Sequence, residues 1–561
     1  MRWAGFCLAA VIVTATQSAP AGAKTQDNAK ISPPLLALVR SHPGEELAVI
    51  VRASPKNGGH HAQRAAGAVG RAHGKVSGNL SIVGSVSATL SGDEILDLAR
   101  DSDVEYISSD DVITVAFDPT TAADLVSGSG LLEVGAPDAW RQLGVTGKGI
   151  GVAVLDSGIT AHPDLGARIV ASVDFTDAGP VGLVPPADPG GHGSHVAGII
   201  AGDGTASGGA YVGVAPAANL IDVRVITATG STTISTLIAG MQWVLGHRSD
   251  YNIRVVNLSA GAPVTTTYRN DPLATAVEVL VFAGLTVVVS AGNEGPKEST
   301  ITTPGSDPYV ITVGGVDDNG TATITDDVLA LWSSRGPTPI DGLAKPDLVA
   351  PGRRIVSLRS PGSTLDQLFP DRAVAGLDPL APAYERMSGT SMAAPVVTGV
   401  VALMLERDPS LTPAQVKARL KGTTSPLAFG SLNTTGTGLV NAVAAVTAGP
   451  SSDPLTEAVS AGFASEMYSF LYGQPLSWRD LTFNGGFDAN GIPWSQVTWA
   501  NVSWDAITWA NVEWASFNWS TVNWQEISWE EISWEGITWE SRSLKDKSKG
   551  RKVRRGWEAL D

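Results

Sequence analysis

The chain has 561 residues, of which 43% are hydrophobic and 17% are charged, so it can bury several cores and is not disordered along its whole length. Its net charge of −17 (38 basic and 55 acidic residues) argues against nucleic acid as a partner, because phosphate backbones bind basic surfaces. The single cysteine excludes a disulfide framework and a cysteine-rich metal site.

The first 23 residues have the pattern of a secretory signal peptide. Arg2 precedes a short apolar run, residues 6–13, and Ala21-Gly22-Ala23 offers a small-residue cleavage site. We therefore expect a secreted, extracellular protein, and a membrane anchor is the alternative interpretation. No other stretch approaches 18 consecutive apolar residues, so no transmembrane helix is predicted.

Residues 31–118 carry strand and helix patterns in the order β-α-β-α-β, which predicts a small α+β domain of ferredoxin-like type. The helix after Ser91 is predicted from the acidic residues of its first turn. Residues 119–130, rich in Thr, Ser, Ala and Gly, predict a linker. The other expected elements are a helix at 58–74 and strands at 47–52, 80–90, 104–107 and 112–116.

Residues 131–448 have a different pattern, in which β-branched apolar runs alternate with Gly/Ala-rich helical stretches. Runs that are apolar on both faces are typical of parallel strands covered by helices on both sides. We therefore predict one large α/β domain with a doubly wound, mostly parallel sheet. The five runs are 150–156, 220–226, 253–259, 285–293 and 309–315.

Four polar residues stand out beside these runs. Asp156 ends the first run and Asn293 ends the fourth, whereas His192 and Ser391 lie in glycine-containing turns that open small-residue helices. Functional sites in open α/β sheets form at the carboxyl ends of strands. None of these four residues is convincing alone, so the argument depends on their combination.

The segments VAVLDSGI, GHGSHVAG, SAGNEG and SGTSMAAP together resemble those of the subtilisin-like serine proteases, in that family's order of Asp, His and Ser. The resemblance covers about residues 131–448. It implies the family's fold and a serine endopeptidase that works through an acyl-enzyme. It assigns Ser391 as the nucleophile, His192 as base and acid and Asp156 as the carboxylate that orients His192. Asn293 is then an oxyanion donor.

The chemistry of acyl transfer agrees with these roles. A serine hydroxyl is a poor nucleophile at neutral pH and needs a base, and a neutral histidine can take its proton and return it to the leaving amine. A carboxylate on the other ring nitrogen fixes the tautomer and stabilises the imidazolium. One oxyanion donor such as Asn293 contributes about 3 kcal/mol in the transition state. We expect His195 and His162 to be structural.

Two segments resemble walls of the family's substrate cleft: Leu258-Ser259-Ala260-Gly261 resembles one wall of its primary specificity pocket, and Thr229-Gly230-Ser231 resembles the opposing strand. Both are small and uncharged, so we expect peptide to bind as an added strand in an open cleft of broad specificity. The chemistry requires no organic cofactor. Calcium stays open as a structural ion, because Asp164 resembles a family ligand position but the loop 202–213 lacks the oxygen-bearing side chains of a tight site.

The N-terminal α+β domain resembles the propeptide of this family, most clearly over residues 88–111. The resemblance implies a folding assistant and intramolecular inhibitor, removed by autocleavage between about residues 118 and 131. A parallel-sheet protease has many non-local contacts and folds slowly, so a template on the same chain is physically sensible. A permanent N-terminal domain is the alternative. We expect a monomer that acts on protein or peptide substrates.

Ten of the sixteen tryptophans recur every five residues between Trp494 and Trp539. Residues 494–540 therefore form a repeat of Trp-x-x-Φ-x units, in which Φ is apolar. A spacing of five fits neither a straight strand nor a helix, whereas a turn in each unit, as in a square β-solenoid, would keep the rings equivalent. Short strand-turn units that order only on a surface are the alternative. Residues 449–493 are expected to link this repeat to the preceding domain.

We expect the repeat and the basic tail 541–561 to form a non-catalytic attachment module that binds a cell-envelope polymer or substrate protein. A solvated tail that pairs with the acidic repeat is the bland alternative. Two other functions stay open for the whole chain: an inactive binding protein on the protease fold, and a C-terminal module that the protease merely processes.

Overall fold

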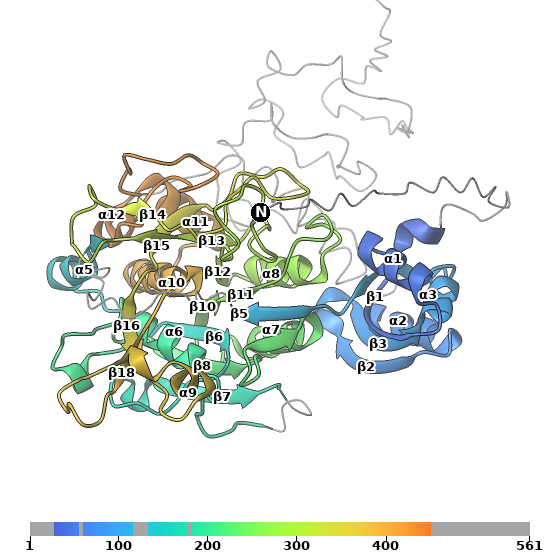
Figure 1. Cartoon of the computed structure of the whole chain (residues 1–561), viewed down its shortest axis with the longest axis horizontal. Helices are drawn as coiled ribbons and strands as arrows, with labels where there is room; N and C mark the ends of the chain where they lie inside the picture. Colours follow the sequence, from blue (N-terminus) through green and yellow to red (C-terminus); the bar gives the residue numbers. More distant parts are fainter. Residues whose placement is uncertain (1–26, 55–59, 116–132, 177–181, 450–561) are drawn as a thin grey trace, which may run out of the picture. The chain divides into compact units, whose positions relative to one another are not determined.

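The computed structural model describes residues 27–54, 60–115, 133–176 and 182–449 (Figure 1). The predicted signal peptide, the linker 119–130, the repeat 494–540 and the basic tail lie outside these residues. Within the described part of the chain, no helix has both the length and the apolar character needed to cross a membrane.

The N-terminal domain has helices packed on one face of a four-stranded antiparallel sheet with the order β2-β3-β1-β4. Alternate residues of β1 serve two cores: Val49 and Val51 face the domain's own helices, and Ile50 joins a core of the large domain. The elements are η1 (Asp27–Lys30), α1 (Pro33–Ser41), β1 (Glu46–Ala53), α2 (His61–Arg71), β2 (Lys75–Leu80), η2 (Ser81–Val83), β3 (Ser85–Ser91), α3 (Gly92–Leu98) and β4 (Val104–Ser109).

The helix predicted after Ser91 is confirmed as α3, and its first turn explains why it begins there. The Ser91 hydroxyl accepts the Glu94 N–H at 3.4 Å, and the Glu94 carboxylate accepts the Ser91 N–H at 2.8 Å, which together form a capping box. The single strand predicted over 80–90 is wrong. A 3-10 turn at Ser81–Val83 separates β2 from β3, and Gly84 in the left-handed region allows the chain to reverse there.

The large domain is built on an eight-stranded sheet with the order β14-β13-β12-β10-β6-β8-β7, in which β15 also pairs with β13. Every pairing is parallel except that of β14. The five predicted runs are confirmed as β6 (Gly151–Asp156), β8 (Asn219–Arg224), β10 (Ile253–Leu258), β12 (Thr286–Ser290) and β13 (Ile311–Asp317). The sequence did not predict β7 (Ile169–Asp174), β14 (Val328–Leu329) or β15 (Leu348–Pro351) as strands.

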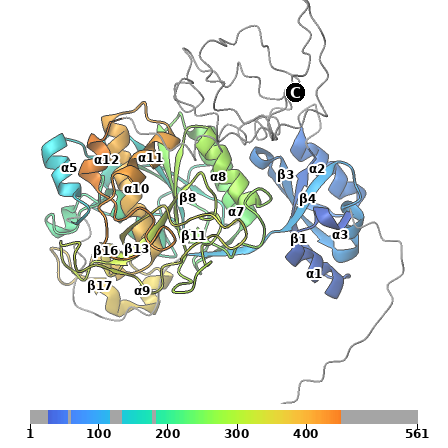
Figure 2. The same cartoon turned by 90° about the horizontal axis from the view of Figure 1, so that it is seen from above.

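Helices cover both faces of this sheet (Figure 2). Alternate residues of β6 show the division, because Val152 and Val154 belong to one core and Ala153 and Leu155 to the other. The first core includes α5 (Ala136–Leu143), α6 (His192–Ala201), α10 (Thr390–Arg407), α11 (Pro413–Gly422) and α12 (Ala442–Thr447), and the second includes α7 (Ile234–His247) and α8 (Pro272–Phe282). The strand ends near α6 and α10 carry the predicted site.

The strand β5 (Val112–Val115) was expected to complete the N-terminal domain, but it has other partners. It runs antiparallel between β9 (Ser231–Thr233) and β11 (Ala260–Gly261) of the large domain. Figure 1 shows β5 beside β11. The expectation failed because the apolar pattern of a short strand does not specify which sheet edge it joins. A further small sheet contains β16 (Ile355–Leu358), β17 (Ala373–Val374) and β18 (Tyr384–Met387), with α9 (Thr364–Leu368) between its strands.

Candidate active site

Asp156 is the last residue of β6, in the middle of the parallel sheet. Its side chain is fully buried, and its Oδ1 accepts the Ser157 N–H at 2.7 Å and the His192 Nδ1–H at 2.8 Å. A buried carboxylate held in this way stabilises a positive charge on the imidazole next to it. The hydrogen bond also places the ring proton on Nδ1, so that the Nε2 lone pair of the neutral ring is available to take a proton.

His192 is the first residue of α6, and the loop before it is fixed by Asp188. The Asp188 Oδ1 accepts the Gly191 N–H at 2.7 Å and the Ser157 hydroxyl at 2.8 Å, and its Oδ2 accepts the Ser194 N–H at 2.8 Å. Burial raises the pKa of Asp188, and these hydrogen bonds oppose that shift. Gly191 has φ of +98° and no room for a side chain, because a Cβ there would lie 2.4 Å from the Ser363 hydroxyl oxygen.

Ser391 is the second residue of α10, which packs against α6, so the predicted nucleophile and base begin two neighbouring helices. The Ser391 hydroxyl donates to the backbone carbonyl of Ser259 at 2.9 Å, and the Ser259 hydroxyl donates to the Ser391 carbonyl at 3.2 Å. The Asn257 amide donates to the Ser259 hydroxyl at 3.0 Å and accepts from the Thr398 hydroxyl at 2.8 Å. This buried chain of hydrogen bonds fixes the first turn of α10 on the end of β10.

Thr390 sets the orientation of the Asn293 side chain through two hydrogen bonds. The Asn293 Oδ1 accepts both the Thr390 N–H at 3.0 Å and the Thr390 hydroxyl at 2.9 Å. Its Nδ2 is buried and donates to no atom of the described residues. A buried amide N–H₂ without a protein acceptor is costly unless a ligand supplies one. The geometry therefore fits a donor aimed at a negative charge that forms during a reaction.

The other polar residues of the two loops have structural partners. His195 is fully buried, its Nε2–H donates to the Ile355 carbonyl at 3.1 Å, and burial followed by the nearby His192 lowers its pKa to about 3. His162 donates to the Ala383 carbonyl at 3.0 Å, and the Ser194 hydroxyl accepts the Thr160 N–H at 2.9 Å. These contacts are those of residues that hold loops in place.

The residues around Asp164 do not fit a calcium ion at this position. The Tyr384 hydroxyl and the Ala206 N–H, each at 2.7 Å, donate to the two carboxylate oxygens, and the Arg168 guanidinium donates to the carbonyls of Asp164 and Ala201. A cation in this place would have to displace these donors and approach a guanidinium. Elsewhere among the described residues, no group of three or more His, Cys, Asp or Glu side chains is arranged to hold a metal.

The two predicted cleft walls lie on either side of β5. Val115 faces Ala260 and Thr114 faces Gly261 on one wall, and the Val115 N–H donates to the Gly230 carbonyl at 3.1 Å on the other. Ser231 faces Thr114 from the same side as Gly230. The two walls therefore hold β5 as an extended strand by main-chain hydrogen bonds. The remaining predicted wall residues, Leu258, Ser259 and Thr229, lie outside this pairing. Leu258 is buried in the core at the end of β10, and the Ser259 carbonyl accepts the Ser391 hydroxyl.

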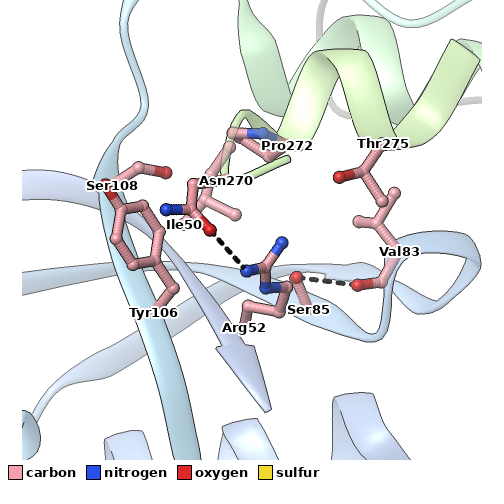
Figure 3. A pocket seen from close by; sticks show the side chains of 9 residues that line it. All are labelled: Ile50, Arg52, Val83, Ser85, Tyr106, Ser108, Asn270, Pro272 and Thr275. Carbon is pink, nitrogen blue, oxygen red and sulfur yellow. Dashed lines mark hydrogen bonds between the residues drawn. The ribbon is translucent and has the colours of Figure 1, made fainter. Parts of the chain in front are cut away.

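The N-terminal domain also contacts the large domain through polar groups around α8 (Figure 3). The Arg52 guanidinium donates to the Arg269 carbonyl at 3.2 Å and to the Asn270 Oδ1 at 3.3 Å, beside the ring of Tyr106. Together with Ile50, Val83, Ser85, Ser108, Pro272 and Thr275, the residues Arg52, Tyr106 and Asn270 line a small pocket. None of the four predicted catalytic residues lines it, so this pocket belongs to the contact between the domains.

A second contact places Asp110 at the N-terminus of α7. The Asp110 carboxylate accepts the Ser235 N–H at 2.8 Å and the Ser235 hydroxyl at 2.6 Å. An acidic side chain at this end of a helix interacts favourably with the free N–H groups and the helix dipole. It anchors the chain two residues before β5 begins, at the point where β5 enters the cleft.

The sequence did not predict Asp188, Thr390 or Asn257 as parts of the site. Asp188 lies four residues before His192 and Thr390 directly precedes Ser391, but a lone Asp or Thr in a loop is too common to be singled out. Asn257 gave a clearer signal, because it is a polar residue inside an otherwise apolar buried strand. Its role became visible only when the structure brought Thr398 and Ser259 to it.

Known proteins with similar sequences indicate the family of the large domain. The sequence profile of the subtilase family matches residues 147–449. The chain is 44% identical to the serine protease AprX of Bacillus subtilis over 303 residues, which cover 53% of this chain and 66% of AprX. It is 34% identical to subtilisin E of B. subtilis over 377 residues, which cover 66% of this chain and 83% of subtilisin E.

A solved structure is similar as well. Fervidolysin from Fervidobacterium pennivorans, a keratinolytic enzyme related to subtilisin, matches with a TM-score of 0.55 and 26% sequence identity. The match covers 72% of this chain and 62% of fervidolysin. The chain thus spans somewhat less than two thirds of the length of both AprX and fervidolysin.

Proposed function

Because the chain belongs to the subtilase family of serine endopeptidases, we propose that it hydrolyses peptide bonds with Ser391, His192 and Asp156 as its catalytic triad. The observation that carries this proposal is the buried Asp156–His192 hydrogen bond at 2.8 Å, with Ser391 in the first turn of α10, which packs against the His192 helix α6. The Asn293 amide, oriented by Thr390, completes the set of groups that acyl transfer needs.

The proposed reaction proceeds in two halves. His192 Nε2 takes the proton of the Ser391 hydroxyl while the oxygen attacks the peptide carbonyl, and Asp156 stabilises the imidazolium that forms. The imidazolium then gives its proton to the leaving amine, which leaves an acyl group on Ser391. Water, activated by the same histidine, releases the acyl group and restores the hydroxyl.

The reaction also requires that the negative charge of the tetrahedral intermediate be stabilised. Asn293 Nδ2 and the backbone N–H of Ser391, at the N-terminus of α10, are the proposed donors to this oxyanion. These groups are fixed before the reaction, so they lower the barrier without reorganisation. No step requires an organic cofactor. The protein donors on both carboxylate oxygens of Asp164 argue against a calcium ion bound to that residue.

We propose further that residues 31–118 act as an intramolecular inhibitor in a zymogen. The support is the position of β5, which occupies the strand between both cleft walls that a substrate would take. Val115, the last residue of β5, faces Ala260, which directly follows Ser259, and the Ser259 carbonyl accepts the Ser391 hydroxyl. This register favours self-cleavage in the first residues after Val115, upstream of the interval expected from the sequence.

The test compares the full chain with its Ser391→Ala variant, and uses Ser410→Ala at an exposed serine as the matched control. We expect the unchanged chain and the Ser410→Ala variant to cleave casein and to lose an N-terminal fragment, as seen by intact mass. The Ser391→Ala variant should do neither. Equal casein cleavage by Ser391→Ala would overturn the proposed function, and the same fragment in that variant would overturn self-processing.

Secretion and the role of the C-terminal repeat are proposals that the sequence alone supports. The signal-peptide pattern of residues 1–23 supports export, and the tryptophan array at 494–540 supports attachment to a cell-envelope polymer or protein substrate. Binding of the full chain to isolated cell envelopes, compared with a chain that ends at residue 449, tests the second proposal. Equal binding of both chains would contradict it.

A further inference from the structure

The side chain that precedes the cleaved bond has to lie between two glycine-containing segments. The carbonyl that reacts must approach both the Ser391 hydroxyl and the Asn293 Nδ2. Ser391 is held against Ser259, which leads into Gly261 of β11, and Asn293 follows directly after Gly292. A residue with its carbonyl at this place therefore has its side chain between the Gly261 and Gly292 segments.

Thr302 occupies the space between these two segments. A Cβ at Gly261 would lie 2.5 Å from Thr302 Oγ1, and a Cβ at Gly292 would lie 2.8 Å from Thr302 Cγ2. Both distances are far below van der Waals contact, so the two walls accept only glycine while Thr302 stands between them. The side chain of Thr302 therefore forms the floor on which both walls converge.

Hydrogen bonds to both walls hold Thr302 in place. Its N–H donates to the Ala291 carbonyl at 3.1 Å, and its hydroxyl donates to the same carbonyl at 3.3 Å. The next residue, Thr303, exchanges two backbone hydrogen bonds with Ala262, at 2.9 Å and 3.2 Å, just beyond β11. A β-branched side chain fixed by its backbone on both sides has little freedom to move away from a larger substrate group.

We propose that Thr302 closes the pocket for the residue before the cleaved bond, so that this enzyme cleaves after small residues such as Ala, Gly or Ser and discriminates against large aromatic ones. The proposal rests on the proposed protease function and replaces the broad specificity expected from the two cleft walls alone. The sequence is consistent with it, because Val115 is followed by Ala116, a residue that lies outside the described part of the chain.

The test uses peptides that carry the β5 sequence Val-Ile-Thr-Val, then Ala, Leu, Phe or Lys, then a chromogenic amide. Enzyme concentrations are set by active-site titration, which also shows that each variant is folded. For the wild type we expect kcat/KM to be on the order of 100-fold higher with Ala than with Phe. Thr302→Gly should raise the Phe-to-Ala ratio at least about tenfold, and Thr302→Ser, which loses only the methyl group, should raise it less.

The matched control is Thr286→Gly, which removes a buried threonine side chain at the amino end of β12, at the opposite edge of the sheet. We expect it to keep the wild-type ratio. A wild type that cleaves the Phe peptide as well as the Ala peptide overturns the inference, and so does an unchanged ratio in Thr302→Gly. If Thr302→Gly does not fold, the wild-type ratio and Thr302→Ser decide. Absence of Ser391-dependent cleavage of every peptide would instead refute the proposed function itself.

Discussion

Thr390 orients the amide of Asn293, the proposed oxyanion donor, and its substitution by valine tests that proposal. Thr390→Val keeps the shape of the side chain and the backbone N–H that bonds Asn293 Oδ1 at 3.0 Å. It removes the hydroxyl that bonds the same oxygen at 2.9 Å and accepts the Gly292 N–H at 3.3 Å. One of the two hydrogen bonds that orient the Asn293 amide is thus lost.

The expected size of the effect follows from these contacts. A complete side-chain oxyanion donor contributes about 10²- to 10³-fold to kcat. A single neutral hydrogen bond contributes about 1 kcal/mol, which corresponds to roughly fivefold in rate. We therefore expect Thr390→Val to lower kcat by about fivefold to tenfold with little change in KM, because the oxyanion forms only in the transition state. Thr390→Ser keeps the hydroxyl and should stay near the wild type.

The assay is steady-state kinetics on a chromogenic peptide, with thermal unfolding to correct for any loss of folded enzyme. A double-mutant cycle with Asn293→Ala gives the sharper result. If Thr390 acts through Asn293, Thr390→Val has no further effect on kcat once Asn293 is alanine. Equal kcat values for Thr390→Val and Thr390→Ser would refute the reasoning, as would fully additive effects in the cycle.

Three further predictions concern pH, calcium and inhibition. Burial, followed by the charge of Asp188, raises the pKa of Glu385 to about 8, so between about pH 4.5 and 8 the folded state keeps a proton that the unfolded state loses. The free energy of unfolding should therefore fall as pH rises through this window, by up to about 1.4 kcal/mol per pH unit. Measured by urea unfolding at several pH values, this fall should be smaller in Glu385→Gln, and an unchanged slope against pH would contradict the prediction. Because both Asp164 carboxylate oxygens already have protein donors, EDTA should leave the melting temperature unchanged, and a large drop would show that a cation binds. Ile113→Asp places an unpaired carboxylate at a fully buried position of β5 and should weaken its pairing, so protease activity should appear sooner after the full chain is refolded. Val112→Asp, at a side chain that is 64% exposed, should behave as the wild type. Equal delays before activity in both variants would count against β5 as the inhibitory strand.

β5 and Thr302 together indicate which peptides fit the cleft. The contacts of β5 show how a peptide main chain fits between β9 and β11. In the pocket proposed above, Thr302 packs against Gly261 and Gly292 and limits the side chain that fits beside Ser391. Further upstream in β5, Ile113 is fully buried in a core of the large domain. The enzyme we propose therefore selects its substrates by an aliphatic residue upstream and a small residue at the cut.

The sequence by itself determined the parallel sheet, because strands that are apolar on both faces require helices on both sides, and all five runs with that pattern lie in the sheet. It also predicted Asp156, His192, Asn293 and Ser391, since each lies at a strand end or helix start with a local signature. Each signature is local, but only the combination of the four segments, in the order of a known family, singled these residues out.

Only the tertiary structure decided which distant residues meet. β5 resembles a strand of the N-terminal domain, but its partners lie more than a hundred residues further along the chain. Thr390 acquires its role from Asn293, and Thr302 acquires its role from two glycines on different segments. Edge pairing, the orientation of an amide and the filling of a pocket all depend on contacts between segments, and no pattern within one segment contains that information.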